Sequence, residues 1–474
     1  MRKTKIVGTI GPASRQPEML GKLVAAGLDV ARFNLSHGGW DAQREAVAAV
    51  RRVGNVLGKK VAILLDTRGP EVRLGNFPDG GFSLAVGAHL TLERAQGIGT
   101  PEGSLDRGFF VCAGETDLAR TGDRITVGDG EVVMEVERVE GDRLNCRTVV
   151  GGRIVSGKKL TFPRTRLSLP ALTPEDVADI ERGVEQDGVD WIALSFTRGP
   201  EDVRAARAVV EGAGGKQWIM AKIENRSGVE NLLAVLDVAD GVMVARGDLG
   251  LEYSPEEVPI LQKRIIREAN LRGKPVVTAT QMLETMVKAP RPTRAEASDA
   301  ANAILDGTDA VMLSEETAVG DFPLEAVAFL ASLAQTVERA FPPEDSLGRE
   351  ISDATRAISR ASCNVSTAVG AAAIVTATSS GHTARQVAMH RPNVPIIAVT
   401  PFEEVARRLQ MVWGVLPWVG GRVASADQVI DEASLAALAS GLVREGEKVV
   451  ITAGVPVGIT GTTNMIKVQT VGCE

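Results

Sequence analysis

Residues 217–248 read QWIMAKIENRSGVENLLAVLDVADGVMVARGD, and this stretch decides the fold. Two near-continuous apolar runs, WIMA and GVMVA, flank a segment long enough for a helix. Runs without polar alternation are typical of parallel strands that are buried on both faces. Each run passes directly into charged residues, Lys222 and Glu224 after the first and Arg246 and Asp248 after the second. The stretch therefore predicts a strand–helix–strand unit of a parallel sheet.

The same alternation continues along the chain in both directions. We expect eight such strands, at residues 5–10, 29–36, 61–67, 189–196, 217–224, 240–248, 275–281 and 309–316. Helix starts are visible between them, as where Thr173 precedes Pro174 as an N-cap. Eight strands, each followed by a helix except at one insertion, predict an α/β fold of the (β/α)₈ TIM-barrel type. An open doubly wound sheet is the alternative fold.

Two changes of pattern divide the chain into three domains. Residues 71–162 lose helical periodicity and carry alternating pieces such as RITV and RLNCRTVV between glycine-rich turns, which predicts a small inserted β-barrel or sandwich. Because loops after barrel strands face the active site, this insertion is placed as a lid. We expect the catalytic barrel at 1–70 and 163–342, the lid at 71–162, and a C-terminal α/β regulatory domain at 343–474.

Composition excludes several classes of function. The 474 residues carry a net charge of −7, and only one of them is tyrosine, so neither nucleic acid nor an acidic membrane is an expected partner. The four cysteines and four histidines show neither disulfide-framework nor zinc-ligand spacing. No apolar run is long enough to span a bilayer. We expect a reduced, cytoplasmic protein.

Charged residues gather where the predicted strands end, on the rim that carries the active site in such barrels. Glu224 and Asp248 end successive strands, which lie about 5 Å apart in a sheet. Two carboxylates so close repel each other unless a cation lies between them, and hard oxygen ligands favour Mg²⁺. The alternative is an ion pair of Lys222 with either carboxylate that only closes the barrel core.

A second group of polar residues lies on the same rim. Arg32, Asn34 and Ser36 are spaced by two residues, so one strand face would carry all three. Arg32 and Lys222 would form an anion site beside the metal, equipment typical of phosphoryl transfer or enolate stabilisation. Asn34 and Ser36, with Asp66, offer oxygen ligands with one negative charge, which suits a monovalent cation; strand-end capping is the alternative.

Three other features are weaker indicators. GRIVSGKK, at residues 152–159, nearly matches a phosphate-binding loop, but it lacks the final hydroxyl residue and no helix can follow it. Lys158 stays a candidate phosphate contact beneath the lid, and His37 is expected near the mouth, although a lone histidine is more often structural. The turn TSSGHT, residues 378–383, is a candidate phosphate cradle or a simple helix cap.

Seven motifs in order along nearly the whole chain closely resemble pyruvate kinase: RFNLSHG, LDTRGPEVR, AKIEN, VARGDLG, TATQML, RPTRAEASDAANA and MLSEETA. GVPVGITGTTNMIKV near the end resembles the bacterial form. The resemblance implies transfer of a phosphoryl group from phosphoenolpyruvate to ADP, giving ATP and pyruvate in the last step of glycolysis. It also implies an allosteric homotetramer.

The matching motifs imply roles for individual residues. Glu224 and Asp248 would bind Mg²⁺ or Mn²⁺, Lys222 would stabilise the phosphoryl group and the enolate, and Arg32 would contact the substrate phosphate. The amides of Gly247 and Asp248, with Thr280, would hold the substrate carboxylate, and Thr280 also lies near the site of protonation. The K⁺ ligands would be Asn34, Ser36, Asp66 and the carbonyl of Thr67. The nucleotide contacts would be Arg73, also a catalytic residue, Lys158 and His37.

Some positions depart from the family pattern or leave the ligand open. Arg68 replaces a lysine, KKLTFPR replaces KGVNLPG, and Glu175 replaces a lysine near the nucleotide, which would weaken ADP binding. Glu71 is the residue found in members that need K⁺. The effector loop would use Thr378, Ser379, Ser380, Gly381 and Thr383, and the ligand could be fructose 1,6-bisphosphate, ribose 5-phosphate, AMP or none. Competing functions are a Mg²⁺-dependent barrel lyase or aldolase, and a catalytically silent effector-binding protein.

Overall fold

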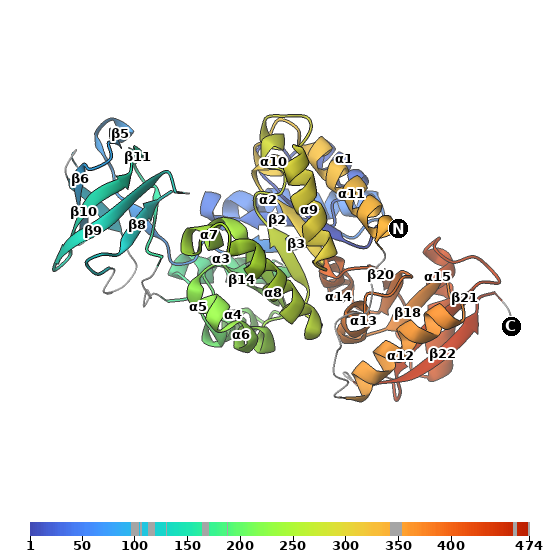
Figure 1. Ribbon diagram of the computed structural model, residues 1–474. Helices are drawn as coiled ribbons and strands as arrows, with labels where there is room; N and C mark the ends of the chain where they lie inside the picture. Colours follow the sequence, from blue (N-terminus) through green and yellow to red (C-terminus); the bar gives the residue numbers. More distant parts are fainter. Residues whose placement is uncertain are drawn as a thin grey trace.

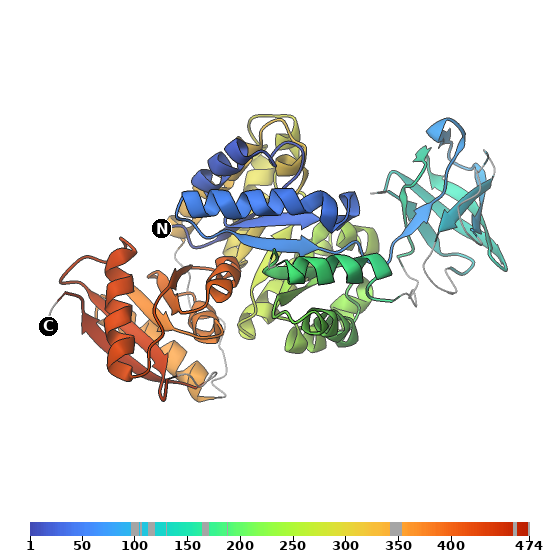
Figure 2. The ribbon, with the colours of Figure 1, turned by 180° about the vertical axis from the view of Figure 1, so that it is seen from behind.

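The computed structural model describes residues 1–95, 104, 107–111, 119–128, 130–163, 170–186, 188–341, 353–457 and 462–472. A central barrel carries a small β-domain at one end and an α/β domain at the other (Figures 1 and 2). The boundary expected at residues 342–343 and part of the segment 454–468 lie outside the described residues. No helix among the described residues is long and apolar enough to cross a membrane.

Within the described residues, eight parallel strands close the central barrel in the order β1-β17-β16-β15-β14-β13-β3-β2. They are β1 (Lys5–Thr9), β2 (Val30–Asn34), β3 (Ala62–Asp66), β13 (Trp191–Leu194), β14 (Trp218–Ile223), β15 (Gly241–Ala245), β16 (Val276–Ala279) and β17 (Ala310–Leu313). The predicted TIM barrel is confirmed, and the open-sheet alternative was wrong, because β1 pairs with both β2 and β17.

The strands are shorter than the apolar runs, and this corrects one predicted feature. β2 ends at Asn34, where the side-chain oxygen accepts a hydrogen bond from the Ser36 amide at 3.1 Å and the chain turns into η1 (Leu35–His37). Ser36 therefore does not continue the strand face of Arg32, as its spacing predicted. Similarly, Asp248 lies in the first turn of α7 (Arg246–Glu252) and not at a strand end.

Helices surround the barrel, and their caps follow the sequence signals. Thr173 accepts a hydrogen bond from the Asp176 amide, and the Asp176 carboxylate accepts one from the Thr173 amide, which completes a capping box. The helices are α1 (Pro17–Ala26), α2 (Trp40–Val56), α3 (Pro174–Glu185), α4 (Pro200–Gly212), α5 (Arg226–Glu230), α6 (Leu232–Val238), α7, α8 (Val258–Leu271), η3 (Glu284–Val287), α9 (Arg294–Leu305), α10 (Glu315–Ala318) and α11 (Pro323–Ala340).

The inserted domain forms a second closed barrel with its own apolar core, separate from that of the central barrel. It lies beyond the rim where the strands of the central barrel end (Figure 1). Its elements are β4 (Val72–Leu74), η2 (Pro78–Gly80), β5 (Gly81–Leu84), β6 (His89–Arg94), β7 (Arg107–Val111), β8 (Arg124–Val127), β9 (Val132–Glu140), β10 (Arg143–Val150), β11 (Gly152–Val155) and β12 (Lys159–Thr161). We call this domain the lid.

The C-terminal domain is a five-stranded sheet in the order β20-β19-β18-β21-β22, with helices on its faces. Its elements are α12 (Ala354–Ala368), β18 (Ala373–Ala377), α13 (His382–Ala388), β19 (Ile396–Thr400), α14 (Glu403–Arg408), η4 (Leu409–Met411), β20 (Val415–Val419), α15 (Ala426–Ala439), β21 (Lys448–Gly454) and β22 (Thr463–Thr470). The edge strands β20 and β22 were not predicted, because one contains proline and the other is largely polar.

This domain packs against the end of the barrel opposite the lid (Figure 2). Trp191 and Trp218 begin neighbouring strands there and meet edge to face, with ring centroids 5.0 Å apart. The Trp191 indole donates a hydrogen bond to the carbonyl of Arg408 at 3.0 Å. One continuous apolar cluster joins the barrel interior to the C-terminal domain, running from Val7 to Val450.

Candidate active site

Asp66, the last residue of β3, contacts two cations, one from the neighbouring strand β2 and one from β14. Arg32 Nε donates to Asp66 Oδ2 at 2.6 Å, and Lys222 Nζ lies 3.2 Å from Asp66 Oδ1. Asp66 is fully buried, which by itself would raise the pKa of its carboxyl, but the charges of Lys222 and Arg32 outweigh burial and hold that pKa below its ordinary value. The carboxylate is therefore charged and fixes both cations in position.

Lys222 has contacts on three sides. Its ammonium donates to Ser195 Oγ at 2.8 Å and lies 3.4 Å from Glu224 Oε2. Burial alone would lower the pKa of Lys222. The negative charges of Asp66 and Glu224 together outweigh burial, so the pKa of Lys222 lies above its ordinary value. The side chain keeps its positive charge in a buried position at the barrel mouth.

Glu224 and Asp248 form the predicted carboxylate pair. Glu224 is 1% exposed, and burial together with the nearby charge of Asp248 raises its pKa, against the opposing effect of Lys222. Its Oε1 accepts the Phe196 amide, while Oε2 is buried and has no hydrogen-bond partner in the described residues. A buried carboxylate oxygen that accepts no hydrogen bond, with the Lys222 ammonium 3.4 Å away, fits a hard cation such as Mg²⁺.

Glu224 and Asp248 alone do not provide a complete set of protein ligands for a metal ion. No group of three or more histidine, cysteine, aspartate or glutamate side chains that could hold a metal is found among the described residues. Mg²⁺ usually keeps several water ligands and takes others from substrate phosphates, so two carboxylates suffice for such a site. The predicted alternative, an ion pair of Lys222, is present as well, because Lys222 Nζ lies 3.4 Å from Glu224 Oε2.

The oxygen group predicted for a monovalent cation is brought together in part. Asn34 and Asp66 are direct partners in the β2–β3 register. The carbonyl of Thr67 accepts the Ser195 hydroxyl at 2.7 Å, and the Asn34 side chain caps η1 through the amide of Ser36. Strand-end capping, the alternative interpretation, is thus seen at Asn34, while the oxygens remain of the kind that K⁺ binds.

Thr280 has a backbone conformation that is rare for a β-branched residue. Its φ is 68°, in the left-handed region, and its Oγ1 accepts the Gly247 amide at 2.8 Å. Arg246 stabilises this turn, because its guanidinium donates to the Thr280 carbonyl at 2.7 Å and to Asp299 at 2.6 Å. Strained residues of this kind cluster at functional sites when their surroundings hold them in place.

The predicted nucleotide contacts lie at the edge of the site and not in its centre. Arg73, on β4, is exposed and pairs with Glu71. Lys158 pairs with Glu131 within the lid, with 2.9 Å between Nζ and Oε2. His37 is exposed at the end of η1. All three therefore present polar groups to solvent near the lid hinge and the barrel rim.

Sequence reasoning missed three groups that complete the site. Ser195 touches Lys222, Asp66 and the Thr67 carbonyl. Asp176 is fully buried at the start of α3 and accepts the amides of Arg68 and Gly69 at 2.9 and 3.1 Å. Lys159 forms an ion pair with Asp248 from the lid. The sequence signals for these residues were weak. Ser195 is a polar residue after a strand, Asp176 belongs to a helix cap, and Lys159 stands in place of a motif glycine.

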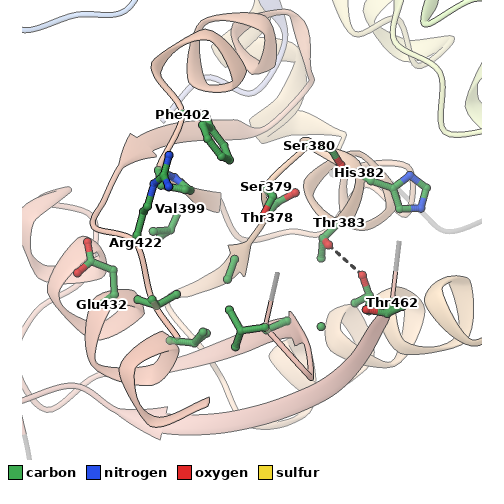
Figure 3. A pocket seen from close by; sticks show the side chains of 18 of the residues that line it. Thr378, Ser379, Ser380, His382, Thr383, Val399, Phe402, Arg422, Glu432 and Thr462 are labelled. Carbon is green, nitrogen blue, oxygen red and sulfur yellow. Dashed lines mark hydrogen bonds between the residues drawn. The ribbon is translucent and has the colours of Figure 1, made fainter. Parts of the chain in front are cut away.

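The TSSGHT turn borders a cavity of about 340 Å³ in the C-terminal domain. Figure 3 shows hydroxyls on one side of the cavity and two charged side chains, Arg422 and Glu432, on the other. The hydroxyl residues that line it are Thr378, Ser379, Ser380 and Thr383, together with Thr462 and Thr463. Gly381 has a φ of 81° and donates its amide to Thr378 Oγ1 at 2.9 Å, so it shapes the turn.

Comparisons with known proteins cover the whole chain. The family described as pyruvate kinase, barrel domain, matches residues 1–327, and the pyruvate kinase alpha/beta domain matches residues 356–469. A pyruvate kinase of Geobacillus stearothermophilus is 45% identical over 477 aligned positions, and the alignment covers 99% of this chain and 80% of that protein. One from Clostridium acetobutylicum is 42% identical over 476 aligned positions, and the alignment covers 99% of this chain and 100% of that protein.

The solved structures agree. A crystal structure of a pyruvate kinase from Cryptosporidium parvum superimposes with a TM-score of 0.90 at 33% identity, covering 99% of this chain and 96% of that one. Both domain types, the full length and the three-dimensional arrangement are therefore shared, and the chain belongs to the pyruvate kinase family.

Proposed function

We propose that the chain transfers the phosphoryl group of phosphoenolpyruvate to ADP through the residues described above. The bond between the enol oxygen and phosphorus breaks, a bond forms from phosphorus to a terminal oxygen of ADP, and the enolate carbon takes up one proton to give pyruvate. Family membership supports the reaction. The observation that carries the mechanism is the buried Lys222 ammonium, held between Asp66 and Glu224.

Glu224 and Asp248 would hold Mg²⁺ or Mn²⁺. The buried Glu224 oxygen without a hydrogen-bond partner supports this assignment. When bound, the ion would neutralise charge on the phosphoryl oxygens. The protein then contributes position and charge rather than covalent chemistry.

Arg32 and Lys222 would act on the phosphoryl group itself. Arg32 would bind the substrate phosphate, since its guanidinium is held by Asp66 and by Thr9 Oγ1 at 2.9 Å. Lys222 would stabilise the charge that passes from the phosphoryl group to the enolate oxygen. Preorganised charge in a buried site costs little reorganisation at the moment of reaction.

The carboxylate of the substrate would meet the turn between β15 and α7. The amides of Gly247 and Asp248, with the Thr280 hydroxyl, would bind it. The hydrogen bond from Gly247 to Thr280 keeps these groups adjacent and supports this role. Thr280 also stands where the enolate would be protonated, with a relayed water as the immediate donor.

A K⁺ ion and the nucleotide complete the proposed site. Asn34, Ser36, Asp66 and the Thr67 carbonyl would bind K⁺, consistent with the strand register that joins Asn34 to Asp66. Arg73, a proposed catalytic residue, would contact ADP together with Lys158 and His37. Movement of the lid would bring Arg73 and Lys158 to the nucleotide, since both lie on lid residues near its hinge.

The decisive test is pyruvate formation from phosphoenolpyruvate and ADP with Mg²⁺ and K⁺. Lys222→Met should lower kcat by about 10³-fold, because a preorganised charge is lost where charge develops. Lys263→Met is a matched control, since Lys263 pairs with Asp306 on the outer helices. Equal rates for wild type and Lys222→Met would refute the mechanism. Full activity without K⁺ would refute the K⁺ site.

The cavity beside the TSSGHT turn would bind an effector with one phosphate. Its hydroxyls would hold the phosphate, and Arg422 is offset by Glu432, whose Oε1 accepts the Gly421 amide at 3.0 Å. A second phosphate would meet that carboxylate. AMP and ribose 5-phosphate therefore fit better than fructose 1,6-bisphosphate, and calorimetric titration with the three compounds separates them.

The remaining assignments follow the family. We propose the division into a barrel at 1–70 and 163–342, a lid at 71–162 and a regulatory domain at 343–474, and a cytoplasmic homotetramer. A lyase or aldolase would need neither the lid nor Arg73, and a silent effector-binding protein would not need the intact group around Lys222. Both alternatives are disfavoured for these reasons.

A further inference from the structure

Lys159 links the lid to the barrel. It lies on β12, where it pairs with Arg73 of β4 in the lid's own sheet. Its side chain leaves the lid, forms an ion pair with Asp248 in the first turn of α7, and places its ammonium 4.5 Å from the centre of the Phe196 ring. One cation from the lid thus contacts two elements of the barrel rim.

Two of the acidic groups that act on this ammonium, Asp248 and Glu224, are those of the proposed metal site. The carboxylates whose charges act on it are Asp248, Glu224 and Glu71. Its side chain is 19% exposed, so water screens these charges less than at the surface. The neighbouring Lys158 differs, because it forms an ion pair with Glu131 within the lid. The two adjacent lysines therefore have separate tasks.

The sequence adds an independent observation. The segment KKLTFPR stands where the resembling motif is KGVNLPG, so Lys159 occupies a glycine position. A glycine there could not reach Asp248. The ion pair therefore depends on the lysine at position 159.

We propose that Lys159 is a positioning residue that takes the place of the divalent cation beside Asp248 while the site is empty, and so holds the lid against the barrel. The inference rests on the proposed metal site. Since an ammonium and a divalent cation cannot both neutralise the same carboxylate oxygen, the two compete. Binding of the metal then frees Lys159, and with it the lid, before the nucleotide arrives.

The test measures Mn²⁺ binding by electron paramagnetic resonance without substrate or nucleotide. Lys159→Met should bind Mn²⁺ about tenfold more tightly than wild type, because no cation has to be displaced. Lys158→Met, which removes the same charge one residue away, should stay within about twofold of wild type, and Lys159→Arg should stay near wild type. Small-angle scattering of the metal-free enzyme should show a larger radius of gyration for Lys159→Met.

The outcomes separate this inference from the proposed function. Unchanged Mn²⁺ affinity in Lys159→Met, an equal gain in Lys158→Met, or an unchanged radius of gyration would overturn the inference. Asp248→Asn should abolish tight Mn²⁺ binding; if it does not, the proposed metal site is wrong and the inference falls with it. Lys159→Gln provides the same readouts should thermal unfolding show that Lys159→Met misfolds.

Discussion

Asp66 determines the charge of the barrel mouth at the scale of a single residue. It is buried between Lys222 and Arg32, with the hydroxyl of Ser195 beside it. Removing its charge leaves the two buried cations without the carboxylate between them. This is costly because a buried charge that has lost its partner is no longer compensated. Its effect is therefore on folding as well as on the positions of the cations.

We predict that Asp66→Asn lowers the free energy of unfolding by about 3 kcal/mol at pH 7. The pKa of Asp66 is lowered in the folded state, so its contribution is present above the unfolded pKa of about 3.9 and disappears as the pH falls through the folded value. Urea unfolding of both proteins from pH 7 to pH 3 measures this. The difference should shrink below about pH 4; a difference that grows on acidification would contradict the assignment.

The residues found from sequence and those missed differ in one physical respect. Lys222 and Glu224 were predicted because a charge at the end of an apolar run is visible within one segment. Ser195 was missed because its partners come from other strands, and Lys159 because its partner Asp248 lies in another domain. Spacing along the chain contains no information on which barrel residue a side chain of the lid contacts.

At the scale of elements, the start of α3 supports the loop that leads into the lid. The carboxylate of Asp176 closes the capping box with Thr173 and also accepts the amides of Arg68 and Gly69 directly after β3. One buried carboxylate therefore accepts hydrogen bonds from the backbone amides of two segments that are far apart in sequence. The sequence predicted the cap at Thr173, but not that its partner also anchors the lid hinge.

Asp176→Ala should lower the free energy of unfolding by about 3 kcal/mol, because it leaves buried amide groups without acceptors. Thr173→Ala should cost about 1 kcal/mol, the usual value for a lost N-cap. Glu175→Ala is the matched control, since Glu175 is exposed in the same turn. Chemical denaturation gives all three values, and a ranking with Glu175→Ala as the most harmful would disprove this account.

Over the whole molecule, the barrel and the C-terminal domain share a buried polar contact. Arg391 of the C-terminal domain donates to both oxygens of Asp309 at 3.0 and 3.1 Å, to Asn270 at 2.7 Å and to the carbonyl of Gly307. Asp309 is 4% exposed, and its carboxylate also accepts the amides of Val276 and Trp413. This contact is buried and comprises several hydrogen bonds, whereas among the described residues the lid reaches Asp248 through the ion pair of Lys159.

Arg391→Ala should destabilise the protein by about 3–5 kcal/mol, the range for a stranded partner of a buried pair. It should also convert one cooperative thermal transition into two, because the domains lose a buried polar link. Differential scanning calorimetry measures both effects. Arg422→Ala, in the same domain but away from this interface, is the control; one unbroken transition at the wild-type temperature for Arg391→Ala would argue against the coupling.

The shared apolar cluster at the base of the barrel has a consequence for protein engineering. A hybrid enzyme that grafts a relative's C-terminal half onto this barrel would bring a foreign surface against Trp191 and Trp218. Such chimaeras should be soluble only when the barrel residues that contact the C-terminal domain, Trp191 and Trp218 among them, are replaced by those of the same relative. The structural boundary between the barrel and the C-terminal domain therefore runs through the apolar cluster that the two domains share.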